Sequence, residues 1–241
     1  MSNFFYRLGR KTGKAIRKPK WYYKAFFGTE TEALQAENIF GQELAEHMKS
    51  EFTIIKNHRL NEFVDEVGGR LVNKVKKPER KFTFIITESA DVNAFALPGG
   101  YIFLSLGILN LCQHNPDALA FILAHEMIHV LSRHPLKKIM TSKSFSMLAN
   151  MLKAGNIVGH LAKQTLTDLI ESIYSQEYEL YADRYGLLLM VSCGYSGQAC
   201  IDALKSLQER TQYNNAFNYF STHPSLEDRI KQLRKELQNK V

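Results

Sequence analysis

The segment His125-Glu126-Met127-Ile128-His129 carries the residues with the clearest chemical potential in this sequence. Residues four apart in a helix lie on one face, so the imidazoles of His125 and His129 could hold one metal ion. Glu126 would then face a water molecule on that ion, which is the arrangement used by zinc-dependent hydrolases. The competing interpretation is a pair of partly buried structural histidines bonded to nearby backbone.

The sequence around this segment predicts the helix that must position it. Asn115-Pro116-Asp117 is typical of a helix start, with an N-cap, a proline at the first position and an acid in the first turn. The apolar run from Ala118 to Leu131 follows, and His134-Pro135 is expected to end the helix. We therefore expect both histidines on a largely buried helix.

A catalytic zinc site needs a third protein ligand. The metzincin pattern is excluded, because Ser132 and Pro135 stand where it requires glycine and histidine. In a later helical stretch, Glu179 and Asp183 lie one turn apart, so Glu179 could bind the metal while Asp183 orients a ligand histidine. From spacing alone, Glu177 is nearly as good a ligand.

The other patterns predict an α+β fold, mostly helical, with a small β-sheet beside the helix that carries the two histidines. Alternating residues predict strands at 82–86 and 101–104, and apolar spacing predicts helices over 31–50, 60–75, 168–191, 198–210 and 225–240. The segment 142–165 fits either a lid over the site or a pair of core helices.

Small and apolar residues alternate through Asn93-Ala94-Phe95-Ala96 and end at Pro98-Gly99-Gly100. An exposed strand edge of this kind could bind an extended polypeptide through main-chain hydrogen bonds. We expect Asn93, Ala94, Phe95 and Ala96 to contact substrate in this way. An ordinary hairpin turn explains the pattern equally well.

Positive charge is concentrated in a basic, aromatic N-terminal tail, residues 1–28. Residues 1–27 carry eight lysines or arginines and no acid, whereas the remainder carries 23 basic and 24 acidic residues. The tail fits an anchor on an anionic membrane surface, a strap packed on the body, or a transit peptide or nucleic-acid arm. The balanced body gives no reason to expect a nucleic-acid partner.

Neither cysteine spacing nor hydropathy indicates a secreted or membrane-spanning chain. Cys112, Cys193 and Cys200 have no C-x-x-C spacing and are predicted to be buried small apolar residues. No apolar stretch reaches the roughly 18 residues needed to span a bilayer, and no secretory signal is seen. We expect a soluble or membrane-peripheral protein, with the cytoplasmic side of a bacterial membrane and mitochondria as possible compartments.

Four segments together resemble the family-48 zinc metallopeptidases: Asn93 to Gly100, His125 to His129, Ser175 to Asp183, and His223-Pro224 with Arg229. This group contains the CAAX prenyl proteases, the heat-shock protease HtpX, periplasmic BepA and the mitochondrial inner-membrane quality-control protease. The resemblance covers about Thr29 to the C-terminus and implies a gluzincin-type metallopeptidase domain, residues 29–241. The sequence has no equivalent of the hydrophobic segment that crosses the membrane in HtpX-like members.

The resemblance also implies roles for individual residues. The family pattern S-R-x-x-E-x-x-A-D selects Glu179 over Glu177 as the third zinc ligand, although Gln176 replaces its arginine and removes a supporting ion pair. His223 matches a histidine kept near the metal, where it could donate to the oxyanion or occupy the open zinc position and hold the enzyme latent.

Two neighbouring predictions concern residues around this site. Tyr174 or Tyr178 could assist His223 in stabilising the oxyanion, and Arg229 is expected to anchor the C-terminal helix rather than touch substrate.

The sequence thus predicts a zinc-dependent metalloendopeptidase that cleaves unfolded or membrane-proximal polypeptides in protein quality control. One zinc ion per chain would be held by His125, His129 and Glu179, with Glu126 as the general base and Asp183 behind a ligand histidine. The alternative is a non-catalytic, zinc-stabilised adaptor or chaperone-like module tethered to membrane by its tail. A permanently ligated His223 would favour that alternative, because a closed four-ligand site has no catalytic water.

Overall fold

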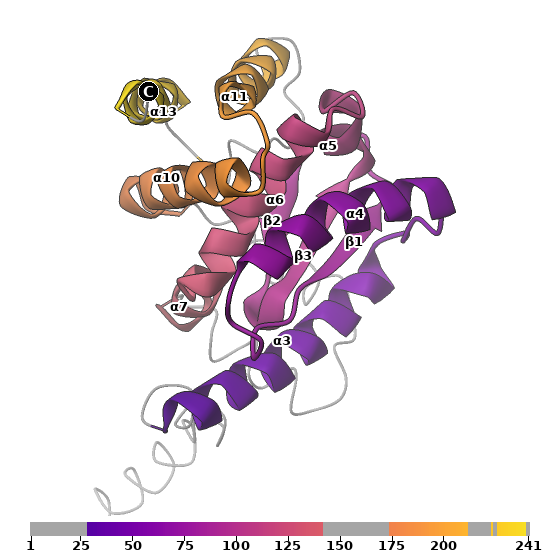
Figure 1. Cartoon of the computed structure of the whole chain (residues 1–241). Coiled ribbons are helices and arrows are strands. Elements are labelled where there is room, and N and C mark those ends of the chain that lie inside the picture. Colours follow the sequence, from indigo (N-terminus) through magenta and orange to yellow (C-terminus); the bar gives the residue numbers. More distant parts are fainter. Residues whose placement is uncertain (1–27, 142–173, 212–222, 224–225, 240–241) are drawn as a thin grey trace, which may run out of the picture.

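The computed structural model describes residues 28–141, 174–211, 223 and 226–239, in which helices surround a small sheet (Figure 1). The elements in chain order are α3 (Glu30–Glu51), α4 (His58–Lys74), β1 (Thr83–Thr87), β2 (Ala94–Ala96), the 3-10 helix η1 (Pro98–Gly100), β3 (Tyr101–Ser105), α5 (Leu106–Leu111), α6 (Pro116–Leu131), α7 (His134–Thr141), α10 (Gln176–Ser192), α11 (Gln198–Thr211) and α13 (Leu226–Gln238). The predicted α+β class, mostly helical with a small sheet, is confirmed.

The sheet has the strand order β1-β3-β2, so β2 lies at one edge. β1 runs parallel to β3 and β2 runs antiparallel to it, with Phe95 opposite Phe103. Their rings stack with centroids 5.1 Å apart. The two interpretations of residues 93–100 are therefore compatible, because the segment forms both an edge strand and, through η1, the turn of a hairpin.

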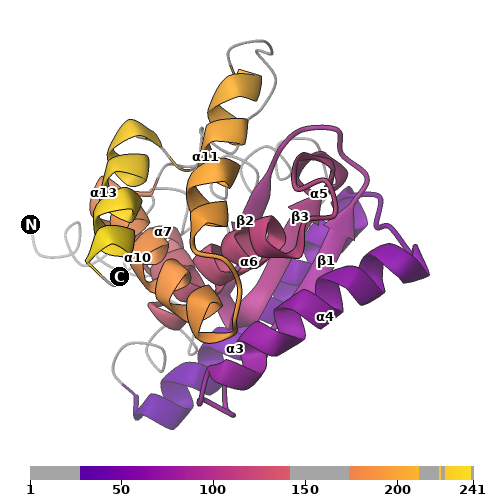
Figure 2. The same cartoon turned by 45° about the horizontal axis from the view of Figure 1, so that its top comes forward.

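Both faces of the sheet are covered, which explains the continuous apolar run of β3. Ile86, Ile102 and Leu104 belong to the core that includes α4 and α6. Ile85 and Phe103, which alternate with them, pack with apolar residues of α3. Figure 2 shows the sheet with α3 on one side and α4 and α6 on the other.

Helix α6 forms the centre of the molecule. Its N-cap Asn115 accepts hydrogen bonds from the backbone N–H groups of Asp117 and Ala118, and Pro116 occupies the first helical position, as predicted. Helices α10 and α11 both pack on α6, and α13 packs on α10 and α11, at the end of the molecule away from α3 (Figure 1). Helix α6 ends at Leu131, before His134-Pro135 as expected. His134 then begins a new helix, α7, after a short turn.

Several predicted boundaries differ from the structure. Helix α10 begins at Gln176 rather than near residue 168, because Ser175 has an extended backbone and its hydroxyl caps the helix by accepting from Tyr178 N–H. The helices expected at 198–210 and 225–240 are present with small shifts. The predicted tail and the segment 142–165 lie outside the described residues.

Two further sequence predictions concern membranes and cysteines. In the part of the chain that the structure describes, no helix combines the length and the apolar character needed to cross a bilayer. The three cysteines are free, and Cys112 and Cys200 are buried. Cys193 is only partly buried, so the prediction of a buried position was wrong there; it lies just past the C-terminal end of α10.

Candidate metal centre

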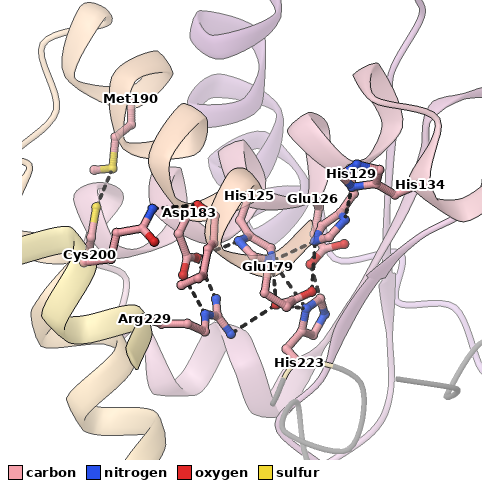
Figure 3. Close-up of polar contacts among 12 residues, drawn as sticks. His125, Glu126, His129, His134, Glu179, Asp183, Met190, Cys200, His223 and Arg229 are labelled. Carbon is pink, nitrogen blue, oxygen red and sulfur yellow. Dashed lines mark hydrogen bonds and ion pairs between the residues drawn. The ribbon is translucent and has the colours of Figure 1, made fainter. Parts of the chain in front are cut away.

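Helices α6 and α10 bring the predicted metal ligands together. Among the described residues, His125, His129, Glu179 and His223 each offer one ligand atom, and these atoms all lie within 4.8 Å of one another. All four side chains are fully buried, and Figure 3 shows them pointing toward a common centre. Glu177, the alternative ligand, is exposed in the first turn of α10.

The separations among the donor atoms of His125, His129 and Glu179 fit a zinc site. Tetrahedral ligands at about 2.0–2.1 Å from zinc lie about 3.3–3.4 Å from one another. His125 Nε2 is 3.0 Å from His129 Nε2 and 3.5 Å from Glu179 Oε2, and His129 Nε2 is 3.3 Å from Glu179 Oε1. His223 Nδ1 lies 3.3 Å from His125 Nε2 and 2.7 Å from Glu179 Oε2.

The protonation states of two of the donor histidines suit a metal ion. Burial lowers the pKa of His129 to about 3 and that of His223 to about 4, so both rings offer lone pairs at neutral pH. Burial acts to raise the pKa of Glu179, but the neighbouring imidazoles hold it well below its ordinary value. Burial opposes a charge on His125, yet the carboxylates of Asp183 and Glu179 raise its pKa to about 9. At neutral pH His125 therefore carries a proton, and a metal ion bound to its ring would take the place of that proton.

Glu126 is fully buried beside the donor group. Neither of its carboxylate oxygens accepts a hydrogen bond from the described residues, and its Oε1 lies 3.5 Å from His223 Nε2. Burial raises the pKa of this carboxyl to about 8. Buried polar atoms without hydrogen-bond donors are rare, so this carboxylate needs a functional explanation.

Asp183 and Arg229 support His125 from behind (Figure 3). Asp183 Oδ1 lies 2.9 Å from His125 Nδ1, and the Arg229 guanidinium donates to both Asp183 oxygens at 2.6 and 2.7 Å. Arg229 Nη1 is also 3.3 Å from Glu179 Oε2. Although burial acts to raise the pKa of Asp183, Arg229 and His125 lower it, so Asp183 is an anionic acceptor for His125 Nδ1–H.

Arg229 therefore does more than anchor α13, because it holds Asp183 and Glu179 in place. Gln176 stands where the S-R-x-x-E-x-x-A-D pattern has an arginine. Gln176 Nε2 donates to Asp228 Oδ2 at 2.7 Å instead, and the cation paired with Asp183 comes from α13.

Two aromatic contacts distinguish the tyrosines considered for the oxyanion. The ring of Tyr174 stacks on His129 with centroids 4.2 Å apart. Tyr178 stacks instead on His134, with centroids 3.9 Å apart. His134 is not one of the donors but contacts the donor His129. Of the two rings, that of Tyr174 is the one stacked on a donor residue, and its role in catalysis stays a prediction.

His134 is the residue of this region that sequence reasoning missed. Its Nδ1 lies 2.9 Å from His129 Nδ1, and its side chain is buried. The only sequence signal was that His134 follows His129 by five residues. That spacing does not predict the contact, which depends on a left-handed backbone conformation at Arg133 (φ 58°).

The predicted substrate edge lies beside the helix that carries His125 and His129. Strand β2 packs against α6, Ala94 and Ala96 are buried, and Phe95 is partly buried. Asn93 precedes the strand, and its N–H donates to Ser105 Oγ at 3.0 Å. That these residues bind substrate stays a prediction.

Comparison with known proteins places these features in a family. The model of Peptidase family M48 matches residues 58–237. Mitochondrial metalloendopeptidase OMA1 of Schizosaccharomyces pombe is 31% identical over 212 residues, covering 83% of this chain and 61% of its own length. A putative beta-barrel assembly-enhancing protease of Vibrio cholerae is 27% identical over 212 residues, covering 83% and 44%. The chain thus spans less than two thirds of the length of these relatives.

Proposed function

This chain belongs to peptidase family M48, a family of metallopeptidases, and on that premise we propose that it is a zinc-dependent metalloendopeptidase. The observation that carries the proposal is the convergence of His125, His129 and Glu179 beside a buried Glu126. The separations of the donor atoms and the neutral imidazoles of His129 and His223 support zinc as the ion.

In this proposal, His125, His129 and Glu179 hold the zinc ion and Glu126 handles the proton. When bound, zinc polarises a peptide carbonyl and lowers the pKa of a water molecule to about 7. Glu126 accepts the proton of the attacking water and delivers it to the nitrogen of the leaving amine. The burial of this carboxylate beside the donor group, with neither oxygen bonded to the described residues, supports its role as a general base.

His223 determines whether the site is open. Its Nδ1 faces Glu179 and its Nε2 faces Glu126, so it has access both to the metal position and to the reaction centre. As a donor it would stabilise the oxyanion of the tetrahedral intermediate. As a fourth ligand it would close the site, which supports either a latent enzyme or the non-catalytic adaptor.

We propose unfolded or membrane-proximal polypeptides as substrates, bound in extended form along the β2 edge at Ala94 to Ala96. An edge strand offers main-chain donors and acceptors that do not depend on the sequence of the substrate. Such a mode of binding suits protein quality control, in which many different sequences must be accepted.

We also propose that residues 1–28 form a membrane-surface tail attached to a metallopeptidase domain, residues 29–241. The cluster of basic and aromatic residues in the tail supports binding to anionic lipids. Deletion of residues 1–27 is expected to abolish binding to vesicles that contain phosphatidylserine. Unchanged binding by the truncated protein would contradict this part of the proposal.

The catalytic proposal is tested with an unstructured protein such as casein and three proteins: wild type, Glu126→Gln and His223→Ala. Zinc-loaded wild type should cleave casein, and Glu126→Gln should bind zinc but cleave at least about 100-fold more slowly. A lower rate for His223→Ala would support the oxyanion role, and a higher rate would support latency. Cleavage by Glu126→Gln at the wild-type rate would refute the mechanism.

A further inference from the structure

His134 is a buried histidine that the proposed mechanism does not use. It is only 4% exposed, and its Nδ1 lies 2.9 Å from the Nδ1 of His129. Arg133, between α6 and α7, has a left-handed conformation, and the His134 ring lies beside that of His129 near the end of α6 (Figure 3).

A contact between two Nδ1 atoms requires a proton on one nitrogen and a lone pair on the other. His129 can bind a metal through Nε2 only when the proton of its neutral ring is on Nδ1. His129 must then donate, and His134 must accept. The opposite arrangement would place the proton of His129 on Nε2, among the donor atoms of His125 and Glu179.

The ring of His134 is fixed by a neighbour on the second helix of the site. Tyr178 stacks on it with centroids 3.9 Å apart and an interplanar angle of 7°. Tyr178 directly precedes Glu179, so this stacking connects His134 to the helix that supplies the third ligand. The acceptor atom is therefore held in place relative to both α6 and α10.

We propose that His134 is a positioning residue that accepts a hydrogen bond from His129 Nδ1–H and so keeps the Nε2 lone pair of His129 directed at the metal. The two metal-binding histidines of α6 thus have different supports. His125 is held by the anionic Asp183, and His129 is held by a neutral imidazole, which adds no further negative charge to the site. This inference rests on the proposed zinc site.

The test compares zinc affinities, measured by competition with a chromophoric chelator, for wild type, His134→Phe and His134→Asn. Phenylalanine keeps a ring against Tyr178 but removes the acceptor, so affinity should fall about 10–100-fold. Asparagine can place Oδ1 where Nδ1 lies and should restore most of the affinity. His58→Phe, at an exposed surface position, is the matched control and should bind zinc like wild type.

A second readout comes from the wild-type protein and does not depend on how the variants fold. Nitrogen-15 NMR of the zinc-loaded protein should show His129 protonated at Nδ1, with a coupling across the hydrogen bond to His134 Nδ1. Protonation of His129 at Nε2, or wild-type affinity in a folded His134→Phe protein, would overturn the inference. Failure of wild type to bind zinc at all would instead overturn the proposed function.

Discussion

At the scale of single residues, the site depends on two buried acidic side chains that are paired with a buried cation. Arg229 has no exposed surface, and its guanidinium lies between the carboxylates of Asp183 and Glu179. Ions removed from water are stable only when their partners and hydrogen bonds are in place. Arg229 is therefore required for the conformation of both acids.

Replacement of Arg229 by methionine should destabilise the protein by about 3–5 kcal/mol, because two buried carboxylates would lose their cation. The free energy of unfolding, measured with urea on the metal-free protein, checks this prediction. Arg234→Met, at an exposed position on the same helix, serves as the control and should have little effect. Equal free energies of unfolding for the two variants would show that Arg229 is not needed for the stability of the fold.

Some residue roles followed from the sequence, and others required the fold. His125 with His129, and Glu179 with Asp183, are four residues apart, so helical geometry alone placed each pair on one face. His134 contacts His129 only because Arg133 adopts a positive φ, which spacing does not indicate. The pairing of Arg229 with Asp183 joins residues 46 positions apart and could not be derived from local pattern.

At the scale of elements, the distance between α6 and α10 decides whether the ligands meet. Gly186 of α10 lies against the backbone of His125, and a methyl group there would lie 3.2 Å from His125 N. Glycine therefore permits the close approach that lets Glu179 and Asp183 reach the histidines of α6.

Gly186→Ala should push the two helices apart by a few tenths of an ångström and weaken zinc binding. A competition assay with a chelator measures the loss. Gly69→Ala in α4 is the matched control, because an added methyl meets no atom within 4 Å there, and the change should stabilise the helix by about 0.5–1 kcal/mol. Zinc affinity that is unchanged in Gly186→Ala would exclude this role for the glycine.

The elements themselves were predicted best where their signals are local. The start of α6 at Asn115-Pro116 follows from capping, and the apolar spacing of α3 and α4 follows from burial of one face. The start of α10 was placed too early, because its apolar pattern gave no sign of the cap at Ser175. The parallel pairing of β1 with β3 depends on tertiary packing and has no local signal.

At the scale of the whole molecule, the site joins segments that are distant in the sequence. Its donors come from α6, α10 and residue 223, and Arg229 adds α13. An unfolded chain would not hold these groups together, so zinc should bind mainly to the folded state and stabilise it.

Zinc should therefore raise the melting temperature of the metal-free protein. At a free concentration 100 times the dissociation constant, the stabilisation is about 2.7 kcal/mol, which corresponds to roughly 5–10 °C for a domain of this size. Calorimetry with and without zinc measures the shift, and Glu179→Ala should show a much smaller one. An equal shift in that variant would place the stabilising zinc elsewhere.

The central claim is that His125, His129 and Glu179 hold one zinc ion, and elemental analysis of the purified protein tests it most directly. Wild type should contain about one zinc per chain, Glu179→Ala should lose it, and Glu177→Ala, altered at the exposed neighbouring acid, should retain it. Full zinc content in Glu179→Ala, or none in folded wild type supplied with zinc, would contradict the account.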